Sequence, residues 1–311
     1  MASLAMIEQP QATILETTTR VKDEKDESDA DAPLEKERLI DEEVVMIKQK
    51  PLTSNGLNTL KHLVRVGGFT ARWRGLGVSL VYHMAHSLAV NLLTSFFLPS
   101  LMLRAVAYIV SSVLLSKIHM TWTHVMISQP SSQPWFKRVP GGKEVWKTLA
   151  LPSFVFASAQ VLTVAYPVFI FASESMIPWT GRLGLAALTM LSFSIAILLP
   201  ASVTLTRIEA SLLPEDQETI VPFDRTFNGA VSSDAPTSNK TLFVEAWKSF
   251  DKALRTRLIK FYIKMAFIMF MIVVTGVHLI VAEAYLIGID RLVLFAQAMD
   301  AKLVLANQAR N

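Results

Sequence analysis

The sequence predicts an all-α fold, a polytopic bundle of about five transmembrane helices with amphipathic surface helices on one side. Hydrophobic side chains make up 51% of the 311 residues, and the mean hydropathy is +0.38. Both values are high for a soluble chain. Four runs contain no Asp, Glu, Lys or Arg, at residues 75–103, 148–173, 183–206 and 265–282. Each run reaches about the 18–20 residues that a helix needs to cross a hydrocarbon core of about 30 Å.

A fifth apolar segment, residues 105–128, differs from the others because it carries Lys117, His119 and His124. A single charge near the end of a span can reach the interface along its own alkyl chain, so we count this segment as a span. The spans are placed near residues 75–99, 104–128, 148–173, 183–206 and 259–289, within a transmembrane domain of residues 49–290.

The basic residues assign one side of the membrane. An odd number of spans puts the N-terminal tail and the two long connections, residues 129–147 and 207–257, on one side, which we call side A. The first connection carries four basic residues and one acidic residue, so side A is the cytosol or the mitochondrial matrix. Amphipathic helices are expected on this side at residues 57–66 and 241–257. Residues 207–240 are expected to form a flexible loop.

The two ends of the chain differ from the spans. Residues 1–50 carry a net charge of −6 and the remainder a net charge of +10, and we expect residues 1–48 to be a disordered acidic tail that can recruit a protein partner. Residues 1–20 resemble neither a signal peptide nor a transit peptide. Residues 291–311 are expected to form an amphipathic tail. No basic patch stands apart from the apolar segments, so we expect no nucleic acid as a partner.

Several kinds of chemistry find no support in the sequence. The chain has no cysteine, which excludes disulfides, thiolate metal sites and thioester mechanisms. We find no phosphate-binding loop, no nucleophile elbow and no metal-spaced His/Glu pair. We therefore expect no enzymatic activity, no cofactor and no metal.

The histidines are the most informative polar residues, because five of the six lie in apolar segments. His83 and His86 are three residues apart and share a helix face, and polar groups in spans usually face the bundle interior. One hypothesis is that they line a substrate-binding cavity with His119 and with Lys117, whose charge would bind an anion. A second is that histidine pairs bind haem or a divalent metal. A third is interhelical hydrogen bonding alone, at roughly 0.5–1.5 kcal/mol per contact.

The order of long connection, span, short connection and span recurs along the chain, and it resembles the layout of the mitochondrial carrier family. Residues 68–75 read GFTARWRG, similar to the carrier pattern of Gly, four residues, an aromatic residue, a base and Gly. A second carrier motif keeps its proline and its last base, while its acid and its first base are absent. The residues that carry the resemblance are Gly68, Trp73, Arg74, Gly75, Pro200 and Arg207.

The resemblance covers residues 50–290 in layout and implies transport of a small solute. Carriers close one gate with ion pairs between the acids and bases of the second motif, which are incomplete here, so the chain resembles a degenerate carrier. Residues 221–227 and 246–251 are similar to a fungal multi-pass family labelled "ubiquitin carrier protein". That label does not fit the chemistry, because ubiquitin conjugation needs a cysteine thiolate.

We therefore expect a membrane protein that moves a small solute across an organellar membrane, with the mitochondrion as the first assignment and the endoplasmic reticulum as the alternative. Arg72, Trp73 and Arg74 are positioned to bind an anionic lipid headgroup or to anchor the chain at the interface of the lipid bilayer. The main alternative is a non-transporting membrane adaptor that recruits partners through its acidic tail and its loop of residues 207–239. A haem- or metal-binding membrane protein is a more remote alternative.

Overall fold

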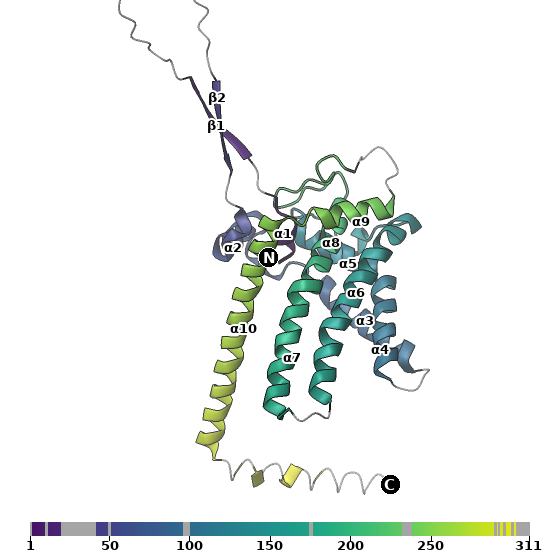
Figure 1. Cartoon of the computed structure of the whole chain (residues 1–311), viewed down its shortest axis with the longest axis vertical. Helices are drawn as coiled ribbons and strands as arrows, with labels where there is room; N and C mark the ends of the chain where they lie inside the picture. Colours follow the sequence, from purple (N-terminus) through teal and green to yellow (C-terminus); the bar gives the residue numbers. More distant parts are fainter. Residues whose placement is uncertain are drawn as a thin grey trace, which may run out of the picture. The chain divides into compact units, whose positions relative to one another are not determined.

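The computed structural model describes residues 2–9, 12–19, 42–48, 51–95, 100–173, 177–231, 238–288, 291, 293–294, 297–299 and 302. Of residues 12–19, 42–48 and 72 it describes the backbone alone. The chain divides into two compact units, residues 1–254 and 255–311, and each is described by itself. The described residues are mainly helical (Figure 1). The predicted C-terminal tail at residues 291–311 lies mostly outside the described residues.

Among the described residues, four helical segments are long and apolar enough to cross a membrane. They contain α3 (Leu76–Ser95), α6 (Lys143–Ala172), α7 (Trp179–Phe193) with the π-helix η4 (Ser194–Leu198) and α8 (Leu199–Ser211), and α10 (Lys252–Ile287). Their apolar faces are largely exposed in the protein. Such faces fit a multi-pass membrane protein, because lipid rather than protein can cover them.

The second predicted span is not one straight helix. It consists of α4 (Leu101–Leu114) and α5 (Ser116–Ile127), which are bent by 61° at Leu115, so the structure has four candidate spans or up to five if this pair is one span. At about 1.5 Å per residue, α4 alone is about 21 Å long, less than a hydrocarbon core. The prediction of a continuous helix failed because α5 buries polar side chains, including Thr123 and His124, against α8.

The surface helices of the first unit are η1 (Leu52–Ser54), α2 (Gly56–Gly67), η2 (Phe69–Trp73), η3 (Trp135–Arg138) and α9 (Asn239–Lys248). The predicted helix at residues 57–66 is confirmed as α2. The Asn55 side chain caps its start by accepting from the Leu57 amide at 3.1 Å, and the Gly68 amide donates to the Val64 carbonyl at 2.8 Å at its end. The predicted helix at residues 241–257 is instead divided, because Asp251 caps α10 at the Leu254 amide.

The N-terminal segment differs from the predicted disordered tail of residues 1–48. Residues Ala2–Ile7 form the short helix α1, and Ala12–Thr19 (β1) pairs antiparallel with Glu42–Lys48 (β2). The acids are concentrated between the strands, whereas the strands are rich in Thr, Ile and Val, which favour extended structure. The prediction relied on the net charge of the whole tail and therefore missed both α1 and the pair of strands. Residues 20–41 lie outside the described residues.

The predicted flexible loop of residues 207–240 also needs correction. Helix α8 continues to Ser211, and three apolar side chains further on are buried, at Leu213, Val221 and Phe227. The Ile220 amide donates to the Ile127 carbonyl at 2.8 Å beside an isolated β-bridge. Buried apolar side chains fix this connection against the end of α5. Residues 232–237 lie outside the described residues.

The core of the first unit lies where α1, α2, α5, α8 and α9 meet (Figure 1). We call this the side-A end, because the connections assigned to side A lie there. One cluster contains Leu4, Ile7, Leu63, Ala71, Ile127, Ala210 and Val221, and another contains Met120, Leu149, Ile208, Phe227, Leu242 and Ala246. The chain therefore concentrates its water-excluded packing at one end of the bundle.

Candidate functional site

The predicted cavity residues begin on α3. His86 is buried, and its Nε2 lies 2.9 Å from the Ser112 hydroxyl of α4, with its ring centroid 4.5 Å from that of Tyr108. Tyr82, one turn earlier, is also buried and lies beside His86. Since residues four apart share a helix face, α3 presents Tyr82 and His86 together to α4 and α5.

The second part of the group comes from α5. The ring of His119 lies 5.3 Å from that of Tyr82, and the ring of Trp122 lies 5.5 Å from His119 and 5.7 Å from His83. His83 is exposed, whereas the side chain of His119 is 14% exposed. Three of the four predicted cavity residues are therefore grouped around Tyr82 and Trp122.

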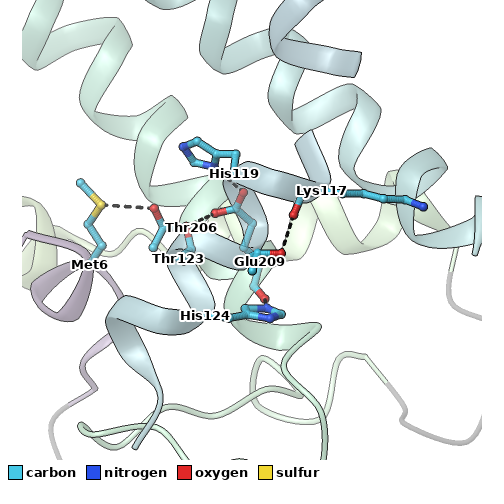
Figure 2. A network of polar contacts seen from close by, with 8 residues as sticks. Met6, Lys117, His119, Thr123, His124, Thr206 and Glu209 are labelled. Atoms are coloured by element: carbon cyan, nitrogen blue, oxygen red, sulfur yellow. Dashed lines mark hydrogen bonds and ion pairs between the residues drawn. The ribbon is translucent and has the colours of Figure 1, made fainter. Parts of the chain in front are cut away.

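The fourth predicted residue, Lys117, lies apart from the histidines. Its ammonium donates to the Gly142 carbonyl at 2.6 Å, and it shares a shallow surface pocket with Lys143, Trp146 and Lys147. Figure 2 shows its side chain directed away from Glu209 and His119. The bend between α4 and α5 turns Lys117 toward the connection at side A. Lys117 therefore does not lie beside the three histidines, contrary to the prediction.

The centre of the site is Glu209 on α8, whose side chain is fully buried. One carboxylate oxygen lies 2.6 Å from Nδ1 of His119, and the other accepts from the Thr123 hydroxyl at 2.5 Å (Figure 2). The Glu209 carbonyl accepts from Nε2 of His124 at 2.6 Å. His119 and Thr123 are four residues apart, so α5 presents both to the same carboxylate.

This arrangement satisfies a group that is costly to bury. A buried carboxylate needs hydrogen-bond donors or a countercharge, and His119 supplies a donor that becomes a cation when protonated. The His119–Glu209 pair can therefore exist as a neutral hydrogen bond or as an ion pair. Ionisable residues within spans are rare, and those that occur mark ion and substrate pathways.

A second network joins α8 to the N-terminus through Arg207, which is only 2% exposed. Its Nε donates to the Met6 carbonyl at 2.9 Å, and one terminal nitrogen donates to the Ser249 carbonyl at 2.8 Å. The Thr206 hydroxyl lies 3.5 Å from the Met6 sulfur (Figure 2). The last turns of α8 thus hold α1, α5 and the end of α9.

Helix α1 is also fixed by the residues that follow it. The buried Glu8 carboxylate accepts from the amide and the hydroxyl of Thr53, which starts the path into α2. The Gln9 amide donates to the Pro222 carbonyl at 3.0 Å, and its side-chain oxygen accepts from the Asp224 amide at 2.9 Å. Residues 2–9 are therefore part of the folded unit.

Two residues of the long side-A connections, Arg138 and Asp216, complete the side-A end. Arg138 donates to the Ser128 hydroxyl at 2.8 Å and to the Gln217 side chain at 2.6 Å. Burial lowers the pKa of the Arg138 guanidinium, and the carboxylate of Asp216 partly offsets this effect. Both residues lie outside the spans, and they tie the two long side-A connections together.

Asp224 organises the turn that follows. Burial by itself would raise the pKa of Asp224, but hydrogen bonds from the Thr226 side chain and the Asn228 amide lower it below its ordinary value. The Thr226 hydroxyl donates to it at 2.6 Å and the Asn228 amide at 2.6 Å. The ionised form of Asp224 is therefore the form that the fold stabilises.

The carrier-motif residues around α3 have structural roles. Gly68 (φ 71°) ends α2, and Gly75 (φ 77°) precedes α3. A Cβ at Gly75 would come within 2.9 Å of the Met126 sulfur, so α3 and α5 approach closely there. The Arg74 guanidinium donates to the Ser128 carbonyl, whereas Trp73 is 66% exposed.

Pro200, the remaining motif residue, is the second residue of α8, and α8 directly follows the π-helix η4. Proline has no amide hydrogen, so it cannot continue the hydrogen bonding of the preceding turn. The helix that leads to Arg207 and Glu209 thus begins with a local change in winding.

Sequence reasoning missed Glu209, Thr123 and Glu8. Glu209 was assigned to a loop because the uncharged run ends at residue 206. A signal was present, since Arg207 and Glu209 directly continue an apolar helical segment and His119 and Thr123 have helical spacing. Within the part of the chain that the structure describes, no three His, Asp or Glu side chains are close enough together to hold a metal ion.

Comparison with models of protein families, with curated proteins and with solved structures finds no match to this chain.

Proposed function

We propose that this chain is a membrane protein of degenerate carrier type that moves a small solute across an organellar membrane. The observation that supports this best is the buried Glu209–His119 contact, which joins α8 to α5 at the side-A end. Burying such a pair gives little net stability compared with apolar packing. A reversible polar contact at the end of a bundle is instead suited to opening and closing a path.

The position of the network supports the same proposal. The resemblance to carriers implies gate charges on the helix that follows Pro200, and most of those charges are replaced here. Arg207 and Glu209 lie on that helix and hold α1 and α5 across the bundle end. We infer that these contacts take over the closing role of the absent ion pairs. The same resemblance favours a mitochondrial membrane, which a tagged copy in cells would test.

The adaptor alternative recruits partners through the acidic tail and through the loop of residues 207–239. Residues 2–9 are engaged by the fold through Glu8 and Gln9, so they are not available as a recruitment segment in this state. This engagement concerns residues 2–9 alone, because most acids of the tail belong to residues 20–41, which lie outside the described residues.

Replacement of His119 by glutamine should separate these functions. Glutamine can still donate a hydrogen bond to Glu209 but cannot become a cation, so folding should persist while the contact can no longer alternate between a neutral hydrogen bond and an ion pair. In proteoliposomes, we expect uptake of at least one member of a panel of radiolabelled carboxylates, nucleotides, amino acids and phosphate. For that solute, His119→Gln should lower the initial rate at least about tenfold, the size expected when a buried charge pair is altered.

The matched control is Lys117→Gln, which removes a charge from the same helix outside the network. It should keep uptake within about twofold of the unmodified protein, because Lys117 is half-buried and bonds to the Gly142 carbonyl rather than within the network. Absence of uptake for the whole panel, or equal rates for the two variants and the unmodified protein, would contradict the proposal.

A further inference from the structure

A cavity whose lining includes none of the residues of the Glu209 network lies among α4, α6 and the α7–η4 segment. It has a volume of about 460 Å³, within the range of about 300–1,000 Å³ that is typical of small-ligand sites. Hydrocarbon side chains provide most of its wall, and they include Leu101, Val161, Val164, Val168, Met190 and Leu198. Because these helices are candidate spans, the cavity lies at the depth of lipid chains.

One cation lies at this otherwise apolar cavity. Arg104 belongs to the first turn of α4, is exposed, and makes no ion pair with any residue that the structure describes. The Ser100 hydroxyl caps the helix at the Leu103 amide at 3.1 Å. A helix N-terminus carries partial positive charge, so Arg104 and the first turn of α4 together favour an anion at this end of the cavity.

The interior of the cavity has few other polar atoms to satisfy. The Tyr108 hydroxyl donates to the Gln160 side chain at 3.1 Å, and the Thr163 hydroxyl donates to the Ala159 carbonyl at 2.7 Å. The Ser194 hydroxyl donates to the Met190 carbonyl at 2.7 Å. These polar groups are paired within the protein, so the interior presents apolar surface to a ligand.

The π-helix η4 forms part of this wall through Ser194 and Leu198. A π-turn inside a long helix is rare and occurs frequently at functional sites. Pro200 accounts for it, since the missing amide hydrogen interrupts the α-helical hydrogen bonding. The change in winding therefore shapes the cavity beside Val164 and Val168.

We propose that this cavity binds a long-chain fatty acid, with its carboxylate at Arg104 and its alkyl chain along Val161, Val164 and Leu198. A carboxylate matches the fork of an arginine guanidinium, and an apolar cavity within the bilayer is filled by an alkyl chain. A single chain fits a single cation and one cavity of this volume. The inference does not depend on transport by the Glu209 network.

The test uses the purified full chain in nanodiscs and a photoactivatable analogue of palmitate with its reactive group in the alkyl chain. Crosslinks should map to residues 160–168 and 190–198. Unlabelled palmitate should compete at least about tenfold better than hexadecanol, which has the same chain without the charge, because one charge-assisted contact accounts for a factor of this size.

Two pairs of variants make the assignment specific. Arg104→Gln should reduce labelling at least about tenfold, whereas Arg65→Gln, the same change at an exposed arginine on α2, should have no effect. Ala165→Trp should block labelling by filling the cavity, whereas Leu162→Trp, on the exposed face of the same helix, should not. A melting curve for each variant checks that the protein remains folded.

Three results would overturn the proposal. Equal competition by palmitate and hexadecanol, or unchanged labelling of Arg104→Gln, would show that the cavity takes bulk lipid without recognising charge. Preferential competition by a diacyl anionic phospholipid would assign the site to a membrane lipid. A crosslink from a photoreactive residue at position 165 to α10 would show that the chain itself fills the cavity.

Discussion

Replacement of Glu209 by alanine should lower the free energy of unfolding by about 3–5 kcal/mol, the range for breaking a buried charge pair by removing one partner. The change leaves His119 and Thr123 without their shared acceptor and opens space between α5 and α8. Unfolding in detergent with increasing denaturant, followed by tryptophan fluorescence, measures the difference.

The control for this experiment is Glu144→Ala. Glu144 forms an ion pair with Lys147, but its side chain is 83% exposed, so its removal should leave the unfolding midpoint nearly unchanged. Glu209→Gln should recover part of the loss, because an amide can still accept from Thr123. Equal midpoints for Glu209→Ala and Glu144→Ala would show that the buried network does not hold α5.

Replacement of Arg207 by alanine should release helix α1 and lower the free energy of unfolding by about 2–4 kcal/mol. A hydrogen bond to a charged group contributes about 1.5–3 kcal/mol, and the contributions of two bonds from one side chain are not fully additive. The Met6 and Ser249 carbonyls lose their donor in a region where water is excluded. Limited proteolysis of an N-terminally tagged chain measures the release, because cleavage near Met6 requires that α1 leave the bundle.

Arg65→Ala on α2 is the matched control, since Arg65 is exposed and its loss should change neither proteolysis nor stability. Arg207→Lys should give an intermediate result, because lysine keeps the charge but cannot donate in two fixed directions. A tag that is removed equally fast from Arg207→Ala and from the unmodified protein would contradict the docking of α1.

The apolar helices were predictable because their signal is local. Runs without charge, such as residues 148–173 and 183–206, identify helices from composition alone. Short capping signals also identified α2, which ends before Gly68 as its sequence predicts. These features depend on neighbouring residues and need no knowledge of tertiary partners.

The polar site was not predictable in the same way. The partners in the His119–Glu209 contact are 90 residues apart in sequence, and composition does not reveal which charge will be buried against which donor. The same limit applies to α1, whose apolar Leu4 and Ile7 are buried only because Arg207 and Glu8 fix its backbone and its end. Averaging over an acidic tail hid this short helix.

The bend between α4 and α5 has a related cause. Both halves are apolar enough to be counted as one span, but α5 also places His119 and Thr123 against α8. Periodicity describes one helix at a time, whereas the bend satisfies a carboxylate on another helix. Because the bend was not predicted, Lys117 was expected to lie beside the histidines. It instead lies at the Gly142 carbonyl.

The membrane topology is tested most directly by single cysteines in sealed vesicles, because the chain has no cysteine of its own. Four exposed positions are used, Ser100, Ser131, Thr180 and Ser238. Each is replaced by cysteine in a separate variant, which is treated with a membrane-impermeant maleimide. With α4 and α5 crossing as one bent span, positions 131 and 238 should react from one side of the membrane and positions 100 and 180 from the other. Reaction of positions 100 and 131 from the same side would contradict the bundle of five spans.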